Sequence, residues 1–127
     1  MTETRCAVLT NKPEASARRI VSALGIDSHF TFIAGGDTFP GMKPSPEPLR
    51  ALLRMADVDA ERALMVGDSV YDIEAAHGAG IAVCAVTWGF QPVEMLKALE
   101  PEFTVSAFEE LSAVIGATAS MPDQLNR

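Results

Sequence analysis

The sequence predicts an α/β fold in which a parallel sheet carries helices on both faces. Short apolar runs alternate along the chain with stretches of helical periodicity. These runs are continuously apolar, which is typical of strands that are buried on both faces. Hydrophobic residues make up 48% of the 127 residues, which is enough for one compact domain with a core of its own.

Five apolar runs are expected to form the strands. Their residue ranges are 6–9, 30–34, 63–66, 81–86 and 103–105. Gly35 follows the second run and Gly67 follows the third, and each is expected to end its strand. Because helical stretches separate all five runs, the strands are expected to lie parallel in one sheet.

Proline and glycine mark the ends of the expected helices. Pro13 fits the first turn of the first helix, and Gly25 is a natural terminator for it. The stretch 37–48 contains four prolines, so we expect a loop that enters the second helix near Pro46 or Pro48. The later helices are expected over the ranges 70–78, 92–99 and 108–115. The domain is therefore predicted to comprise residues 1–116, followed by a frayed tail over 117–127.

Charge and composition exclude several classes of partner. The net charge is −7 and no run of Lys or Arg occurs, so we expect no binding to nucleic acid or to an anionic membrane. Residues 1–5 carry no signal-peptide core, and the apolar stretch at 81–86 is far too short to cross a bilayer. Cys6 and Cys84 lie in apolar runs and are expected to be buried free thiols, with a disulfide as the less favoured alternative. A cytoplasmic location is therefore expected.

Polar side chains follow the predicted strands at the edge where parallel sheets bind ligands. Thr10 and Asn11 come directly after the first strand, and Asp68 comes after the third. Asp72 lies four residues beyond Asp68, on the same face of the next helix, and Lys43 lies in the proline-rich loop. A hydroxyl group, an amine and two carboxylates are thereby expected at one rim of the sheet.

Each of these residues also has a purely structural interpretation. Thr10 could belong to the cap region of the first helix, and Asp68 could cap the helix that starts near residue 70. Asp72 could be a first-turn acid favoured by the helix dipole, and Lys43 could be a solvated surface lysine. The combination is nevertheless suited to phosphate, because carboxylate oxygens bind Mg²⁺ while an amine and free backbone N–H groups bind phosphate oxygens.

Four segments resemble motifs of the haloacid dehalogenase-like phosphatases. Residues 9–12 resemble the second motif of that superfamily, and residues 35–48 resemble the segment that holds its third-motif lysine. Residues 66–80 resemble its fourth motif. Residues 86–90 are similar to the segment after the next strand in phosphoglycolate phosphatases. The resemblance runs in the right order from about Ala7 to Ile115.

The resemblance implies a Mg²⁺-dependent phosphate monoester hydrolase of the phosphoglycolate phosphatase type, on a three-layer Rossmann-like fold. It implies that Thr10, with the backbone of Asn11, binds the phosphate of a small phosphorylated metabolite. Lys43 would hold the phosphate and the charge of the nucleophile. Asp68 would ligate Mg²⁺, and Asp72 would orient Lys43 or a metal-bound water. The reaction of the family proceeds through an aspartyl phosphate.

One part of the family pattern is missing from the 127 residues. The first motif, an apolar strand followed by Asp-x-Asp-Gly, supplies the nucleophile, the general acid and a metal ligand, and no such segment occurs. Residues 57–59 have the acidic spacing but no preceding strand, so they are expected to form a surface loop. The helical cap that lies between the first and second motifs is also missing. We therefore expect an incomplete core, and no hydrolysis by this chain alone.

Several alternatives remain open. The chain could be a truncated fragment, the product of a damaged gene or one half of a split protein. It could also be a non-catalytic module that keeps a phosphate or Mg²⁺ site. A receiver domain is disfavoured, because the paired acids that follow the first strand in such domains are lacking. The missing strand would lie between the strands that carry Thr10 and Asp68, so these strands are expected either to close directly or to pair in a homodimer.

Overall fold

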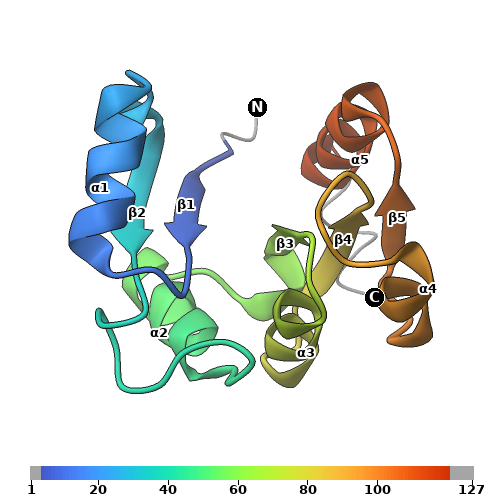
Figure 1. Ribbon diagram of the computed structural model, residues 1–127, viewed down its shortest axis with the longest axis horizontal. Coiled ribbons are helices and arrows are strands. Elements are labelled where there is room, and N and C mark those ends of the chain that lie inside the picture. Colours follow the sequence, from blue (N-terminus) through green and yellow to red (C-terminus); the bar gives the residue numbers. More distant parts are fainter. Residues whose placement is uncertain (1–3, 121–127) are drawn as a thin grey trace.

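The computed structural model describes residues 4–120, and Figure 1 shows the arrangement of its elements. The strands are β1 (Cys6–Leu9), β2 (Phe30–Ala34), β3 (Leu64–Gly67), β4 (Ala82–Val86) and β5 (Phe103–Val105). The α-helices are α1 (Glu14–Ala23), α2 (Glu47–Ala56), α3 (Val70–Gly78), α4 (Val93–Ala98) and α5 (Phe108–Ser120). Two short 3-10 helices, η1 (Asp27–His29) and η2 (Ala60–Arg62), precede β2 and β3. The predicted alternation of strands and helices is confirmed.

The strands are parallel as predicted, but they lie in two separate sheets and not in the one sheet that the sequence predicted. One sheet pairs β1 with β2, and the other has the order β3-β4-β5, with every described pair parallel. In the part of the chain that the structure describes, β1 and β3 present unpaired edges to the space between the sheets, as Figure 1 shows. The direct closure of these two strands, one of the two outcomes expected from the sequence, does not occur.

Prolines set the starts of three helices, as the sequence predicted. Pro13, Pro46 and Pro92 occupy the N-cap positions of α1, α2 and α4. A cap residue at this position needs no backbone donor of its own, because the first N–H groups of a helix have no partner within it. Gly25 follows α1 with a φ of 73°, a left-handed conformation that glycine adopts without steric cost.

Two predictions, on the burial of Cys6 and on the end of the last helix, are corrected by the structure. Cys6 is exposed, whereas Cys84 is buried, because no described strand lies beside β1 on the side that faces away from β2. The last helix continues to Ser120, whereas the sequence predicted that it would end at Ile115. The alanines at 117 and 119 favour helix strongly enough to extend it past Gly116. Residues 121–127 lie outside the described range.

Three apolar clusters fill the two halves of the molecule. The largest joins α2, α3, α4, β3 and β4, and its buried members are Leu49, Ile73, Ala75, Ala76, Ile81, Val83, Ala85 and Leu96. A second cluster packs α5 on β4 and β5 through Cys84, Val86, Val105 and Leu111. The third is smaller and packs α1 on β2 through Ala17, Val21 and Ile33. Within residues 4–120 no helix has the length and apolar character that crossing a membrane requires.

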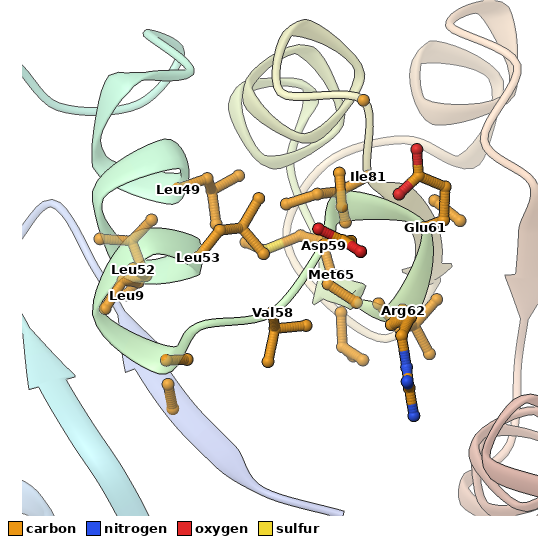
Figure 2. A pocket seen from close by; sticks show the side chains of 18 of the residues that line it. Leu9, Leu49, Leu52, Leu53, Val58, Asp59, Glu61, Arg62, Met65 and Ile81 are labelled. Carbon is orange, nitrogen blue, oxygen red and sulfur yellow. The ribbon is translucent and has the colours of Figure 1, made fainter. Parts of the chain in front are cut away.

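A cavity of about 1570 Å³ lies between the two sheets, and we call it the interstrand cavity. Its lining includes residues 6–9 of β1 on one side and residues 64–66 of β3 on the other. Leu49, Leu52 and Leu53 of α2 also line it, together with Met65 and Ile81 from the other half (Figure 2). Strand edges and apolar side chains thus face the same space.

Candidate functional site

Lys43 and Asp72 form a nearly buried ion pair at the ends of β1 and β3. The Lys43 Nζ donates to Asp72 Oδ1 at 2.6 Å and to the carbonyl oxygen of Leu9 at 3.1 Å. The two side chains are only 11% and 7% exposed. This burial excludes the interpretation of Lys43 as a solvated surface lysine. It also places an ammonium group at the carboxyl end of β1, where a ligand of a parallel sheet would bind.

Asp72 is oriented by backbone groups as well as by Lys43. Its Oδ2 accepts from the backbone N–H of Asp68 at 3.0 Å and from that of Ser69 at 3.2 Å. Ser69, and not Asp68, is the N-cap of α3, and its hydroxyl accepts from the backbone N–H of Asp72. Gly67 has no room for a side chain, because a Cβ there would lie 2.3 Å from Asp72 Oδ2. Both oxygens of the Asp72 carboxylate therefore have partners within the protein.

The Asn11 side chain fastens the proline-rich loop to the end of β1. Asn11 Nδ2 donates to the Lys43 carbonyl oxygen at 2.9 Å, and the Lys43 backbone N–H donates to Asn11 Oδ1 at 3.1 Å. The amide is therefore paired with the main chain of the residue whose ammonium group reaches Asp72. The Asn11 side chain therefore positions Lys43. The binding of phosphate expected for Asn11 concerns its backbone and stays a prediction.

Thr10 lies in the turn between β1 and α1. Its backbone N–H donates to the Ala34 carbonyl at 3.1 Å, which extends the β1–β2 ladder by one bond. Its hydroxyl oxygen accepts from the backbone N–H of Lys12 at 3.2 Å. The first N–H of α1, that of Glu14, donates to Asp37 Oδ1 at 2.8 Å. Thr10 is therefore not the cap of α1, and its hydroxyl still has its own proton to donate.

Asp68 is exposed, unlike Asp72. Its backbone N–H binds Asp72, but its carboxylate accepts no hydrogen bond from the residues the structure describes. Within the same residues there is no group of three or more His, Cys, Asp or Glu side chains arranged to hold a metal ion. The donor set thus fits Mg²⁺ in part: one free carboxylate is present, and the remaining ligands of an octahedral ion would be water, phosphate or a further carboxylate.

The formal charges of the site bear on what it can bind. Lys43 contributes one positive charge, and Asp68 and Asp72 contribute one negative charge each. Because Asp72 is paired with Lys43, these three side chains together carry a net charge of −1. A phosphate dianion would therefore be repelled unless a divalent cation bound Asp68 and reversed the local sign. The arrangement favours joint binding of cation and phosphate over binding of either one alone.

Reasoning from the sequence placed Thr10, Asn11, Lys43, Asp68 and Asp72 together beyond the carboxyl ends of the strands, and in the structure all five lie at the ends of β1 and β3. It missed residues that position this set. Asp37 caps α1, and Thr38 donates to Glu14 Oε1 at 2.8 Å, which ties the turn after β2 to α1. The Gly-Gly-Asp-Thr sequence at 35–38 was the only signal for this role.

A comparison with protein families identifies the chain. The family model of the haloacid dehalogenase-like hydrolases matches residues 2–86. The chain belongs to this family. The matched range includes strands β1 to β4 and both members of the Lys43–Asp72 pair.

Curated relatives and a solved structure refine the comparison. A phosphoglycolate phosphatase from Mesorhizobium japonicum is 45% identical over 106 residues, which are 84% of this chain and 46% of that protein. Another from Rhodospirillum rubrum is 45% identical over 97 residues, 75% of this chain and 40% of that protein. The structure of a predicted phosphoglycolate phosphatase from Haemophilus somnus has 34% identity and a TM-score of 0.82, over 87% of this chain and 49% of that one. The present chain thus spans about half the length of these haloacid dehalogenase-like relatives.

Proposed function

We propose that the chain supplies the phosphate-holding half of a phosphoglycolate phosphatase-like phosphate monoester hydrolase. The observation that carries the proposal is the buried Lys43–Asp72 pair at the carboxyl edge of the parallel sheets. The match to phosphoglycolate phosphatases over most of the chain supports the substrate class. The chain contains no Asp-x-Asp-Gly segment, so the nucleophile would come from outside these 127 residues.

Each residue of the site has a proposed role. The hydroxyl of Thr10 and the backbone N–H of Asn11 would donate to phosphate oxygens. The ammonium group of Lys43 would lie between the phosphate and the nucleophile and offset their negative charges. Asp72 would keep that ammonium group in place. Asp68 would hold Mg²⁺, which when bound would neutralise charge on the phosphate oxygens.

The interstrand cavity separates two strand edges that have no partner strand among the described residues. Lys43 bonds the carbonyl of Leu9 at the end of β1, and Asp72 joins Lys43 to the N–H of Asp68, directly after β3. This chain of contacts limits the separation of the two ends to at most about 11 Å, a limit that permits one strand between them, which would need about 9.6 Å, twice the usual strand spacing. We propose that a strand from outside the 127 residues fills this space and satisfies both edges.

Such a strand would end beside the ammonium group of Lys43. A carboxylate at its carboxyl end would then meet a partly neutralised cation, which favours the ionised, nucleophilic form. Lining side chains such as Leu53 and Met65 are apolar, so the inserted strand should be apolar on both faces. These are the properties that the family resemblance implies for the first motif.

Joining the chain to an N-terminal half tests the proposal. We would fuse the N-terminal half of the Mesorhizobium japonicum relative to residue 1 and assay phosphoglycolate hydrolysis with Mg²⁺. The fusion is expected to be active, the 127-residue chain inactive, and the fusion carrying Lys43→Met reduced at least about 100-fold. Lys97→Met, at an exposed position of α4, is the matched control and should keep full activity.

The alternative function is a non-catalytic module for phosphate and a cation. It gains support from the Lys43–Asp72 pair, which forms without the additional strand. Calorimetry on the 127-residue chain decides between them when combined with the fusion assay. An inactive, folded fusion together with phosphate binding that requires Mg²⁺ would favour the module; hydrolysis by the fusion excludes it.

A further inference from the structure

The loop between β4 and α4, residues 87–92, lies against the turn that carries Asp68. Its first residue is fixed to β5, because the Thr87 N–H donates to the Val105 carbonyl at 3.0 Å. Near its other end, Gln91 Oε1 accepts from the backbone N–H of Val70 at 2.7 Å. Val70 is the first residue of α3, and its N–H has no partner within the helix. The loop is therefore held at both ends and fastened to the start of α3.

Gly89, in the middle of this loop, is in direct contact with Asp68. A Cβ at residue 89 would lie 2.3 Å from Asp68 Oδ2, 2.6 Å from its Cβ and 2.7 Å from its Cγ. Ordinary carbon contacts are about 3.5–4.0 Å. Gly89 is not among the glycines with positive φ, so its backbone is one that other residues adopt. Residue 89 is therefore restricted to glycine by space, because the Asp68 side chain occupies the place that a Cβ would take.

We propose that Gly89 is a positioning residue for Asp68, with the loop 87–92 forming one wall of the cation site. The inference rests on the proposed function, in which Asp68 is the carboxylate that holds the cation. The Asp68 side chain is exposed on its other sides. Contact with the loop therefore limits the directions that the Asp68 carboxylate can take. With no hydrogen bond from the described residues to orient it, contact with the loop is what restricts its rotamer.

Gln91 keeps the wall in place. Its side-chain oxygen is the acceptor for the Val70 N–H, so its loss frees the loop from α3 and leaves that N–H without its partner. Gln91→Glu retains an acceptor oxygen at the same reach, whereas Gln91→Leu does not. The pair of variants therefore separates the hydrogen bond from the size of the side chain.

Binding of Mn²⁺, a paramagnetic substitute for Mg²⁺, tests the proposal on the 127-residue chain with inorganic phosphate present. Electron paramagnetic resonance of free Mn²⁺ gives the affinity. Gly89→Ala is expected to weaken it about 10–100-fold, the usual effect of displacing a group that orients a metal ligand. Gly116→Ala, at a position in α5 where an added Cβ would meet nothing within 4 Å, is the matched control and should change the affinity less than about twofold. Gln91→Leu should weaken the Mn²⁺ affinity, whereas Gln91→Glu, which keeps the acceptor oxygen and adds a negative charge near the cation, should not.

A double-mutant cycle separates positioning from general damage to the fold. If Gly89 acts through Asp68, Gly89→Ala should have no further effect on Mn²⁺ affinity in an Asp68→Ala background. The Asp68 rotamer, measured by three-bond N–Cγ couplings without metal, should change in Gly89→Ala. An unchanged rotamer and unchanged affinity in the folded variant would overturn the inference. A changed rotamer in a chain that binds no Mn²⁺ would instead remove Asp68 from the proposed function and leave the positioning contact standing.

Discussion

Asn11 and Lys43 are joined by two hydrogen bonds that run in opposite directions, although 32 residues separate them in the sequence. The Asn11 amide donates to the Lys43 carbonyl and accepts from the Lys43 N–H, as a neighbouring strand would. The position of the Lys43 ammonium group therefore depends on a side chain that does not contact it.

Asn11→Ala should destabilise the chain by about 1–2 kcal/mol, because two partly exposed hydrogen bonds are lost. Asn11→Asp keeps the acceptor but places a carboxylate oxygen against the Lys43 carbonyl, so it should be at least as destabilising. Urea unfolding measures both values, with Ser28→Ala at an exposed position of η1 as the control. A value for Asn11→Ala equal to that of the control would show that the pairing is not formed.

Lys43→Met should lower the free energy of unfolding by about 3 kcal/mol, because it leaves the Asp72 carboxylate nearly buried without its cation. The two backbone donors that remain on Asp72 keep the loss near the lower end of the usual range. Lys97→Met serves as the control. Combining Lys43→Met with Asp72→Leu should recover part of the loss, and strictly additive effects would contradict a direct interaction.

Glu102 should make the stability of the chain depend on pH below neutrality. Burial raises the pKa of this carboxyl group, but hydrogen bonds from the Val83 N–H and the His77 ring outweigh it, and the net pKa is lowered from 4.5. A lowered folded-state pKa contributes stability above pH 4.5 that is lost as the pH falls through the folded value. Glu102→Gln should therefore be more destabilising at pH 6 than at pH 3 in urea unfolding. An equal effect at both pH values would contradict this assignment.

Cys6 should react rapidly with a thiol reagent, while Cys84 should react only on unfolding. Cys6 is exposed on β1, whereas Cys84 is buried and burial raises the pKa of its thiol. Cys6→Ser removes the fast reaction and identifies its source. In the fusion described above, a strand in the interstrand cavity should slow the reaction of Cys6; an unchanged rate would mean that the cavity stays open.

The unpaired edges of β1 and β3 favour association of the 127-residue chain into a homodimer at micromolar concentration. Sedimentation velocity measures the association. The fusion, whose additional strand would satisfy both edges, should be monomeric under the same conditions. A folded monomer of the short chain would show that the exposed edges do not drive association.

The sequence was sufficient for the parallel α/β architecture, because continuous apolar runs and proline-marked helix starts are local signals. The bounds of β1, β2, β5 and α3 agree with the predicted ranges. Exposure of Cys6 could not be predicted, because an apolar run does not show whether a neighbouring strand covers it. The contacts of Asn11 with Lys43 and of Gly89 with Asp68 depend on tertiary placement of loops far apart in sequence. The family resemblance implied that Asp72 orients Lys43, and the structure shows their ion pair; the roles in a reaction stay predictions.

The division of the strands into two sheets should make local stability differ between the two parts of the molecule. Among residues 4–120, no backbone ladder joins β1 and β2 to the other three strands, and the cluster that packs α1 on β2 has only three buried members. Residues 6–34 should therefore behave as a separate cooperative unit of low local stability. Native-state amide exchange should be fast throughout this unit, including its hydrogen-bonded strands. It should be slowest in β4, whose Val83, Cys84 and Ala85 are fully buried and which has a partner on both sides.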